Sequence, residues 1–125
     1  MIKKYFIIGT LGVALGIALG AFGAHGLKEM VSEKMLANYE TGVRYQMYCS
    51  LGMMIIALAA SLKLELRKPL SLASLLIMIG AIIFSGSLYT MALTGMTFLG
   101  AITPIGGVFM IAGFVYAAFA IMKKI

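Results

Sequence analysis

Polar and reactive side chains gather in one short stretch of this chain, the nonapeptide GVRYQMYCS at residues 42–50. Arg44 is a cation suited to an anionic group such as a lipid phosphate, and Tyr45 and Gln46 offer hydrogen bonds. Cys49 carries the only thiol of the sequence. Because almost every residue from 51 to 62 is apolar, the stretch predicts the polar entrance of a membrane-buried helix.

Enzymatic chemistry is the least favoured use of these groups. Cys49 and His25 are the nucleophile and base that the sequence offers, but a reactive thiol needs a base within about 3 Å and a lowered pKa. The sequence indicates neither, and a buried cysteine usually behaves as a small apolar residue. A single cysteine also excludes an internal disulfide and a multi-thiolate metal site. We therefore expect no enzyme, no metal site and no cofactor.

Composition places these residues in a membrane. Of the 125 residues, 62% are hydrophobic and 11% are charged, and the mean hydropathy is +1.07. Soluble domains are close to half apolar and a quarter charged. About 20 apolar residues cross the hydrocarbon layer once, so the chain has room for four crossings in a single domain, residues 1–125. The sequence predicts an all-α integral membrane protein with four transmembrane helices in one bundle.

The four helices are expected at about residues 5–23, 42–62, 69–90 and 103–122. The first has the layout of a signal peptide, but its length favours a retained helix. Residues 27–40 mix charged and apolar side chains at helical spacing, which predicts an amphipathic interfacial segment between helices 1 and 2. It lies on the membrane surface or forms the first turns of helix 2, with Ser32 as its N-cap.

The last helix is expected to begin where Thr103 precedes Pro104, because threonine suits an N-cap and proline the first helical position. Residues 91–102 carry glycines and no charge, which predicts a short interfacial loop before it.

Basic residues orient the expected bundle. The amino terminus, residues 63–69 and the carboxyl terminus share one side, which holds seven Lys and Arg residues against three on the other. The positive-inside rule then predicts a multi-pass protein of the cell membrane with both termini in the cytoplasm. Since the basic residues occur at helix ends, the net charge of +6 does not indicate nucleic-acid binding.

This orientation brings the polar helix ends together on the outer side. The candidate binding residues of this outer polar layer are His25, Arg44, Tyr45, Gln46, Cys49, Ser85, Ser87, Tyr89 and Thr103. Cys49 lies roughly 10 Å below Gly42 along a helix. A pocket in the layer is expected to open outward and to be closed at its inner end. Arg44 is expected to be anchored by its helical neighbours Glu40 and Tyr48.

Glycines recur at four-residue spacing in the first helix, at Gly12, Gly16 and Gly20. They line one stripe of a helix and allow a neighbouring backbone to approach closely, as membrane helices require. The stripe predicts packing inside the bundle, and self-association across it is the alternative.

Four motifs characterise the chain as a whole: GAFGAHGL at 20–27, YQMY at 45–48, FSGSLY at 84–89 and LGAITPIGG at 99–107. In this order they resemble the YgdD/YwdK family of small bacterial membrane proteins of uncharacterised function, which has relatives in eukaryotic organelles. The resemblance implies a four-helix membrane protein and brings no reaction, ligand or catalytic residue. The chain departs from the family pattern at Cys49, usually a histidine, and at Phe114, usually a tryptophan. A proton relay through an imidazole at position 49 is therefore not expected.

Two functions follow from these observations. The first is a structural or accessory role, in which the bundle packs against itself or another membrane protein through glycine-rich faces. The second is an outward-facing site that binds or transports a lipid or a small anionic or amphipathic molecule. Arg44 would attract the anionic group. The residues expected to orient it are Tyr45, Gln46, Ser85 and Ser87. The expected partners are the lipid bilayer, a second copy or another membrane protein, and a bound lipid, with no nucleic acid.

Overall fold

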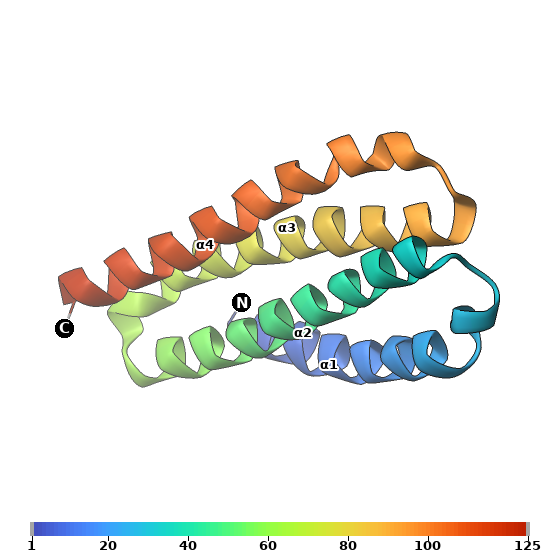
Figure 1. Ribbon diagram of the computed structural model, residues 1–125. Coiled ribbons are helices and arrows are strands. Elements are labelled where there is room, and N and C mark those ends of the chain that lie inside the picture. Colours follow the sequence, from blue (N-terminus) through green and yellow to red (C-terminus); the bar gives the residue numbers. More distant parts are fainter. Residues whose placement is uncertain (1, 125) are drawn as a thin grey trace.

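The computed structural model describes residues 2–124, which are helical almost throughout (Figure 1). Four long helices follow one another: α1 (Ile2–His25), α2 (Glu33–Leu62), α3 (Arg67–Thr94) and α4 (Thr103–Lys124). Short 3-10 turns join them: η1 (Leu27–Glu29), η2 (Leu64–Leu66) and η3 (Thr97–Ala101). Met1 and Ile125, which the expected single domain includes, lie outside the described residues, and of Lys124 only the backbone is described.

All four helices are long and apolar enough to cross a membrane. The predicted all-α class with four membrane-spanning helices is therefore confirmed. The end of the bundle that carries η1 and η3 is called the loop end below. The opposite end, which carries η2 and the two chain termini, is called the terminal end.

The second helix starts well before its apolar part. α2 begins at Glu33 rather than at Gly42, so residues 33–40 of the amphipathic segment form its first turns, while Leu27–Glu29 form the separate turn η1. The predicted N-cap is present, because the Ser32 hydroxyl accepts a hydrogen bond from the Met35 amide at 3.2 Å. The helix continues through these mixed residues because their spacing buries Tyr39 while the charged side chains stay exposed.

The connection between α3 and α4 is shorter than expected. α3 continues to Thr94 and ends at Gly95, whose φ of +76° permits the left-handed cap and whose amide donates to the Met91 carbonyl at 2.8 Å. α4 begins at Thr103 as predicted, but the threonine hydroxyl does not act as an N-cap. It donates instead to the Leu99 carbonyl at 3.2 Å and lies 2.5 Å from the Ser87 hydroxyl of α3.

The helices pack as a row in chain order, not as a closed ring (Figure 1). α1 packs on α2, α2 on α3 and α3 on α4. Between α1 and α3 contact is slight, and within residues 2–124 no substantial contact joins α1 to α4. A row of this kind leaves two open sides: α1 and α3 flank α2 on one, and α2 and α4 flank α3 on the other.

Two buried clusters form the core. The larger one draws on all four helices and includes Tyr5, Met53, Ile77 and Met110. The smaller one lies at the loop end, where the buried residues Leu27, Tyr39 and Ala92 pack with partly buried neighbours. The smaller cluster is called the loop-end cluster below. It packs the loop-end parts of α1, α2 and α3 against η1.

The glycine stripe of α1 packs against α2 of the same chain. A Cβ atom at Gly16 would lie 2.6 Å from the Met47 sulfur, and one at Gly20 would lie 3.5 Å from Val43. Gly12 faces the Ser50 side chain in the same way. In this structure α2 thus occupies the stripe that a second copy would need for self-association.

The closest backbone approach in the bundle joins α3 to α4, which the sequence analysis did not predict. A Cβ atom at Gly106 would lie 2.6 Å from the Gly80 carbonyl oxygen, and one at Gly113 would lie 2.9 Å from the carbonyl oxygen of Ala73. These contacts are to backbone, which cannot turn aside as a flexible side chain can. Three glycines therefore set the crossing of the last two helices.

Candidate functional site

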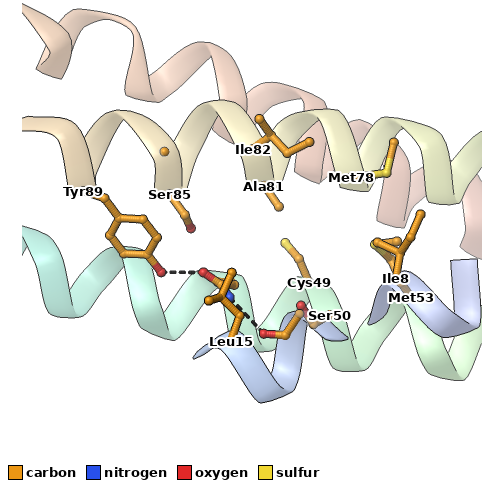
Figure 2. Close-up of a pocket in the computed structure, with 13 residues that line it drawn as sticks. Ile8, Leu15, Cys49, Ser50, Met53, Met78, Ala81, Ile82, Ser85 and Tyr89 are labelled. Carbon is orange, nitrogen blue, oxygen red and sulfur yellow. Dashed lines mark hydrogen bonds between the residues drawn. The ribbon is translucent and has the colours of Figure 1, made fainter. Parts of the chain in front are cut away.

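A groove opens between α1 and α3, with α2 as its floor (Figure 2). We call it the α1–α3 groove. Its volume is ≈ 440 Å³, which falls within the range of pockets that hold small ligands. Four of the predicted site residues line it: Gln46, Cys49, Ser85 and Tyr89. The other lining residues are mostly apolar, and the exposed side chains of Leu15 and Ile82 stand on its two sides.

The polar side chains of the groove are joined by hydrogen bonds across three helices. The Tyr89 hydroxyl donates to Gln46 Oε1 at 2.6 Å, and Gln46 Nε2 donates to the Gly12 carbonyl at 2.9 Å. The Ser85 hydroxyl donates to the Gly42 carbonyl at 2.7 Å. Because a carbonyl can only accept, Gln46 must turn its NH₂ group to α1 and its oxygen to α3. The direction of every bond in this network is thus fixed by chemistry.

The groove is closed toward the loop end by aromatic packing. The Tyr39 ring, 1% exposed, lies 5.2 Å from the Tyr89 ring between centroids, and the Tyr39 hydroxyl donates to the Leu19 carbonyl at 2.6 Å. These residues belong to the loop-end cluster. The groove therefore opens sideways between α1 and α3, and the expected outward opening is corrected, because buried side chains close this end of the groove.

The groove changes character along its length. Figure 2 shows Tyr89 and Ser85 at one end and Ile8, Met53 and Met78 at the other. Gly12, which receives the Gln46 hydrogen bond, lies about 12 Å from Lys4 and about 20 Å from His25 along α1. The polar end of the groove thus lies in the middle third of a membrane-spanning helix, and its apolar end lies nearer the terminal end.

Cys49 lies between the two open sides of the bundle. Its side chain is 2% exposed, and its thiol donates to the Met110 sulfur at 3.2 Å. His25 is far from it: Gly23 packs on Tyr39, which precedes Cys49 by about 15 Å along α2. The structure therefore does not bring the candidate nucleophile and base together. Within residues 2–124, no three His, Cys, Asp or Glu side chains gather into a group that could hold a metal ion.

Arg44 lies outside the groove, on the exposed face of α2 that also carries Tyr48 and Leu51. In the described part of the chain, no hydrogen bond, ion pair or ring contact joins its guanidinium to Glu40 or Tyr48. The prediction that these neighbours anchor Arg44 is wrong, because all three side chains are exposed and the described structure holds no contact between them. The expected anion site of Arg44 with Gln46 and Ser85 is not formed.

The remaining predicted residues are separated from the groove. His25 is exposed at the end of α1. Ser87 and Thr103 hold α3 to the start of α4 through their hydroxyls. Tyr45 packs its ring against Phe84, 4.9 Å away between centroids, and lines a second groove of ≈ 470 Å³ between α2 and α4, where aromatic and apolar side chains predominate.

Sequence reasoning missed several parts of the network. The acceptors at Gly12, Leu19 and Gly42 are backbone carbonyls, which no residue type identifies. Tyr39 was assigned only to an amphipathic segment, although it precedes Gln46 by seven residues and so shares its helix face. That spacing was the available signal.

Comparison with known proteins agrees with this architecture. Residues 19–107 match the model of the DUF423 family, described as a protein of unknown function. The UPF0382 membrane protein YwdK of Bacillus subtilis is 40% identical over 121 residues, covering 97% of this chain and 98% of the relative. A UPF0382 membrane protein of Staphylococcus epidermidis is also 40% identical over 121 residues, covering 97% of both chains.

A third similar protein comes from Haemophilus influenzae. The UPF0382 membrane protein of Haemophilus influenzae is 37% identical over 124 residues, covering 99% of this chain and 98% of the relative. No solved structure matches the chain significantly. The relatives confirm the resemblance seen in the four motifs and, with the four spanning helices, show a multi-pass membrane protein. The chain belongs to the DUF423 family.

Proposed function

We propose that this protein binds an amphipathic lipid in the α1–α3 groove, which the lipid enters from within the plane of the membrane. The observation that carries the proposal is the groove itself, which opens sideways, is apolar along most of its length and has hydrogen-bonding side chains at one end. Such a shape matches a hydrocarbon chain that ends in a small polar group.

The surrounding bilayer is the source of the lipid proposed to occupy the α1–α3 groove. The exposed side chains of Leu15 and Ile82 on the groove's two sides face the hydrocarbon region of a membrane-spanning bundle, where water is scarce and acyl chains are abundant. A dry hollow lined by Met and Ile side chains gains van der Waals contacts when a chain fills it. A lipid is therefore the molecule with both the access and the chemistry to occupy it.

A binding role is favoured over the two other functions considered. The glycine stripe of α1 packs on α2, and Gly80, Gly106 and Gly113 pack between α3 and α4, so these glycine faces are already occupied within the chain. Catalysis lacks a reactive pair, since His25 and Cys49 lie apart. We accordingly propose a non-enzymatic protein without a cofactor.

The proposal includes the placement of the protein in the cell membrane with its terminal end in the cytoplasm. This end holds seven of the ten basic residues, which supports that orientation. The groove's apolar end would then lie toward the cytoplasmic leaflet. A reporter that is active only outside the cytoplasm, fused to the C-terminus, should stay inactive, and its activity there would reverse the orientation.

Fluorescence quenching tests the groove directly, because the chain contains no tryptophan. A tryptophan in place of Ile82 reports on the groove, and one in place of Val108 reports on open lipid-facing surface, since Val108 does not line either groove. The two positions are matched in exposure, at 64% and 66%. In bilayers with a small fraction of brominated acyl chains, we expect stronger quenching for Ile82→Trp.

The Val108→Trp variant is the control against which quenching of Ile82→Trp is judged. Tryptophan at position 108 meets only exchanging bulk lipid, so its quenching should follow the average lipid composition. A retained chain in the groove should make quenching of Ile82→Trp saturate at a lower fraction of brominated lipid. Identical curves for the two variants would mean that the groove holds no lipid beyond the ordinary shell, and the proposed function would fall.

A further inference from the structure

Building on the proposed lipid-binding function, we infer that the α1–α3 groove selects a neutral lipid whose head is a free hydroxyl group, such as a diacylglycerol, over phospholipids. The inference comes from three properties of the groove's polar end: which hydrogen-bonding positions are already used, which charges line it, and how deep it lies.

Most protons at the polar end are already committed. The single hydroxyl proton of Tyr89 goes to Gln46, that of Ser85 goes to Gly42, and one Gln46 amide proton goes to Gly12. The hydroxyl oxygens of Tyr89 and Ser85 still have lone pairs that can accept hydrogen bonds, so the polar end has more free acceptors than free donors. A head group that only accepts hydrogen bonds, such as an ester or a phosphate, finds few donors here, whereas a hydroxyl can donate.

A complementary donor is present nearby. Ser50 lines the same groove and is 7% exposed as a residue. It has no hydrogen-bond partner among residues 2–124. A hydroxyl head group both donates and accepts, so the groove offers acceptors at Tyr89 and Ser85 and a donor at Ser50. A head group paired with Ser50 would give this hydroxyl the hydrogen bond that it lacks within residues 2–124.

No charge lines the groove. Its described lining residues include no Lys, Arg, His, Asp or Glu, and Arg44 lies on the exposed face of α2 outside it. A phosphate or an ammonium head would therefore be buried without an opposite charge, which is far more costly than burying a hydroxyl that forms hydrogen bonds. The groove thus disfavours anionic and cationic lipids alike.

The depth of the groove's polar end in the membrane also favours an uncharged head group. The Gln46 amide meets α1 at Gly12, about 12 Å along the helix from Lys4 and about 20 Å from His25. A charged head group held at this level would need an opposite charge beside it, and the described lining residues of the groove provide none. A neutral lipid with a single hydroxyl crosses this region readily and can place its oxygen at that level.

The selectivity can be measured with the Ile82→Trp reporter and three brominated lipids with identical chains: a diacylglycerol, a phosphatidylcholine and a phosphatidate. We expect the diacylglycerol to reach half-maximal quenching at a mole fraction several times lower than either phospholipid. The Val108→Trp variant should show no difference among the three lipids, because it samples the open surface.

Each other result has a defined meaning. Equal quenching of Ile82→Trp by all three lipids, above that of Val108→Trp, would leave the proposed function intact and overturn the hydroxyl selectivity. A preference for phosphatidate would also overturn it and would indicate an anion site instead. Quenching no stronger than at position 108 would remove both the function and the selectivity.

Variants in the reporter background identify the polar atoms involved. Ser85→Ala removes one acceptor, and the matched control Ser87→Ala changes a serine of the same helix that does not line the groove. A hydrogen bond of about 1 kcal/mol corresponds to about a fivefold change, so Ser85→Ala should reduce the preference for diacylglycerol about fivefold. Tyr89→Phe should reduce it similarly and serves if Ser85→Ala is poorly folded. An unchanged preference in both would contradict the assignment.

Discussion

Tyr89 of α3 donates its hydroxyl proton to Gln46 of α2 at 2.6 Å, and the same glutamine holds α1 at the Gly12 carbonyl. One amide group thereby connects three helices that pack as an open row. In a membrane, where water cannot replace these bonds, the connection fixes the width of the α1–α3 groove and the orientation of its polar end. The stability of the bundle and the proposed lipid binding therefore depend on the same residue, Gln46.

The first prediction concerns this coupling. Gln46→Leu and Tyr89→Phe should each lower the free energy of unfolding by about 0.5–2 kcal/mol, the range for hydrogen bonds between membrane helices. The double variant should lose less than the sum, because both changes break the same bond. Unfolding in mixed micelles with increasing denaturing detergent measures all three values.

A second tyrosine provides the control for the comparison of the two single variants with the double variant. Tyr116 of α4 has no hydrogen-bond partner among residues 2–124 and is 39% exposed. Tyr116→Phe should therefore leave the free energy of unfolding unchanged within about 0.5 kcal/mol. Strict additivity of Gln46→Leu and Tyr89→Phe would show that the bond does not contribute.

The second prediction compares two glycines that differ in their surroundings. Gly106→Ala should destabilise the protein by more than about 2 kcal/mol, because the new methyl group would meet the backbone of α3 near Gly80 and Phe84. Gly86→Ala should be neutral or slightly stabilising, since nothing lies within 4 Å of its Cβ position and alanine favours helices. Thermal unfolding in detergent measures both, and equal effects would contradict the close crossing of α3 and α4.

The third prediction uses the native thiol. Cys49 should react slowly with a membrane-impermeant maleimide in intact cells and quickly after denaturation, because the thiol faces Met110 and the loop-end cluster closes the bundle above it. Glu33→Cys in a Cys49→Ala background is the positive control, because residue 33 is exposed in the first turn of α2. Rapid labelling of native Cys49 would show a water path that this structure lacks.

The fourth prediction separates Arg44 from the groove. Arg44→Gln should change the free energy of unfolding by less than about 0.5 kcal/mol, because the side chain is exposed and forms no ion pair in the described chain. It should also leave lipid quenching of the Ile82→Trp reporter unchanged. Loss of quenching in this variant would restore the anion-binding role that the sequence suggested for Arg44.

The sequence located the polar residues of the groove but not their grouping. The stretch 42–50 was singled out, and it supplies Gln46, Cys49 and Ser50 to the groove. The sequence suggested Arg44 as the functional cation because an ionisable residue in a membrane helix is a candidate functional group. Its position on the lipid-facing side depends on which faces of α2 the neighbouring helices cover, and this information is not local.

Hydrophobicity and helical periodicity determined the membrane location, the four spans, the Ser32 cap and the start of α4, because these depend on the composition and spacing of consecutive residues. Only the tertiary structure decided that the helices pack as an open row, that Gly80, Gly106 and Gly113 bring α3 and α4 closest, and that the groove opens sideways. The physical reason is that these backbone carbonyls accept hydrogen bonds from other helices, and these glycine surfaces pack against other helices. Their partners come from distant parts of the chain, and only packing brings them together.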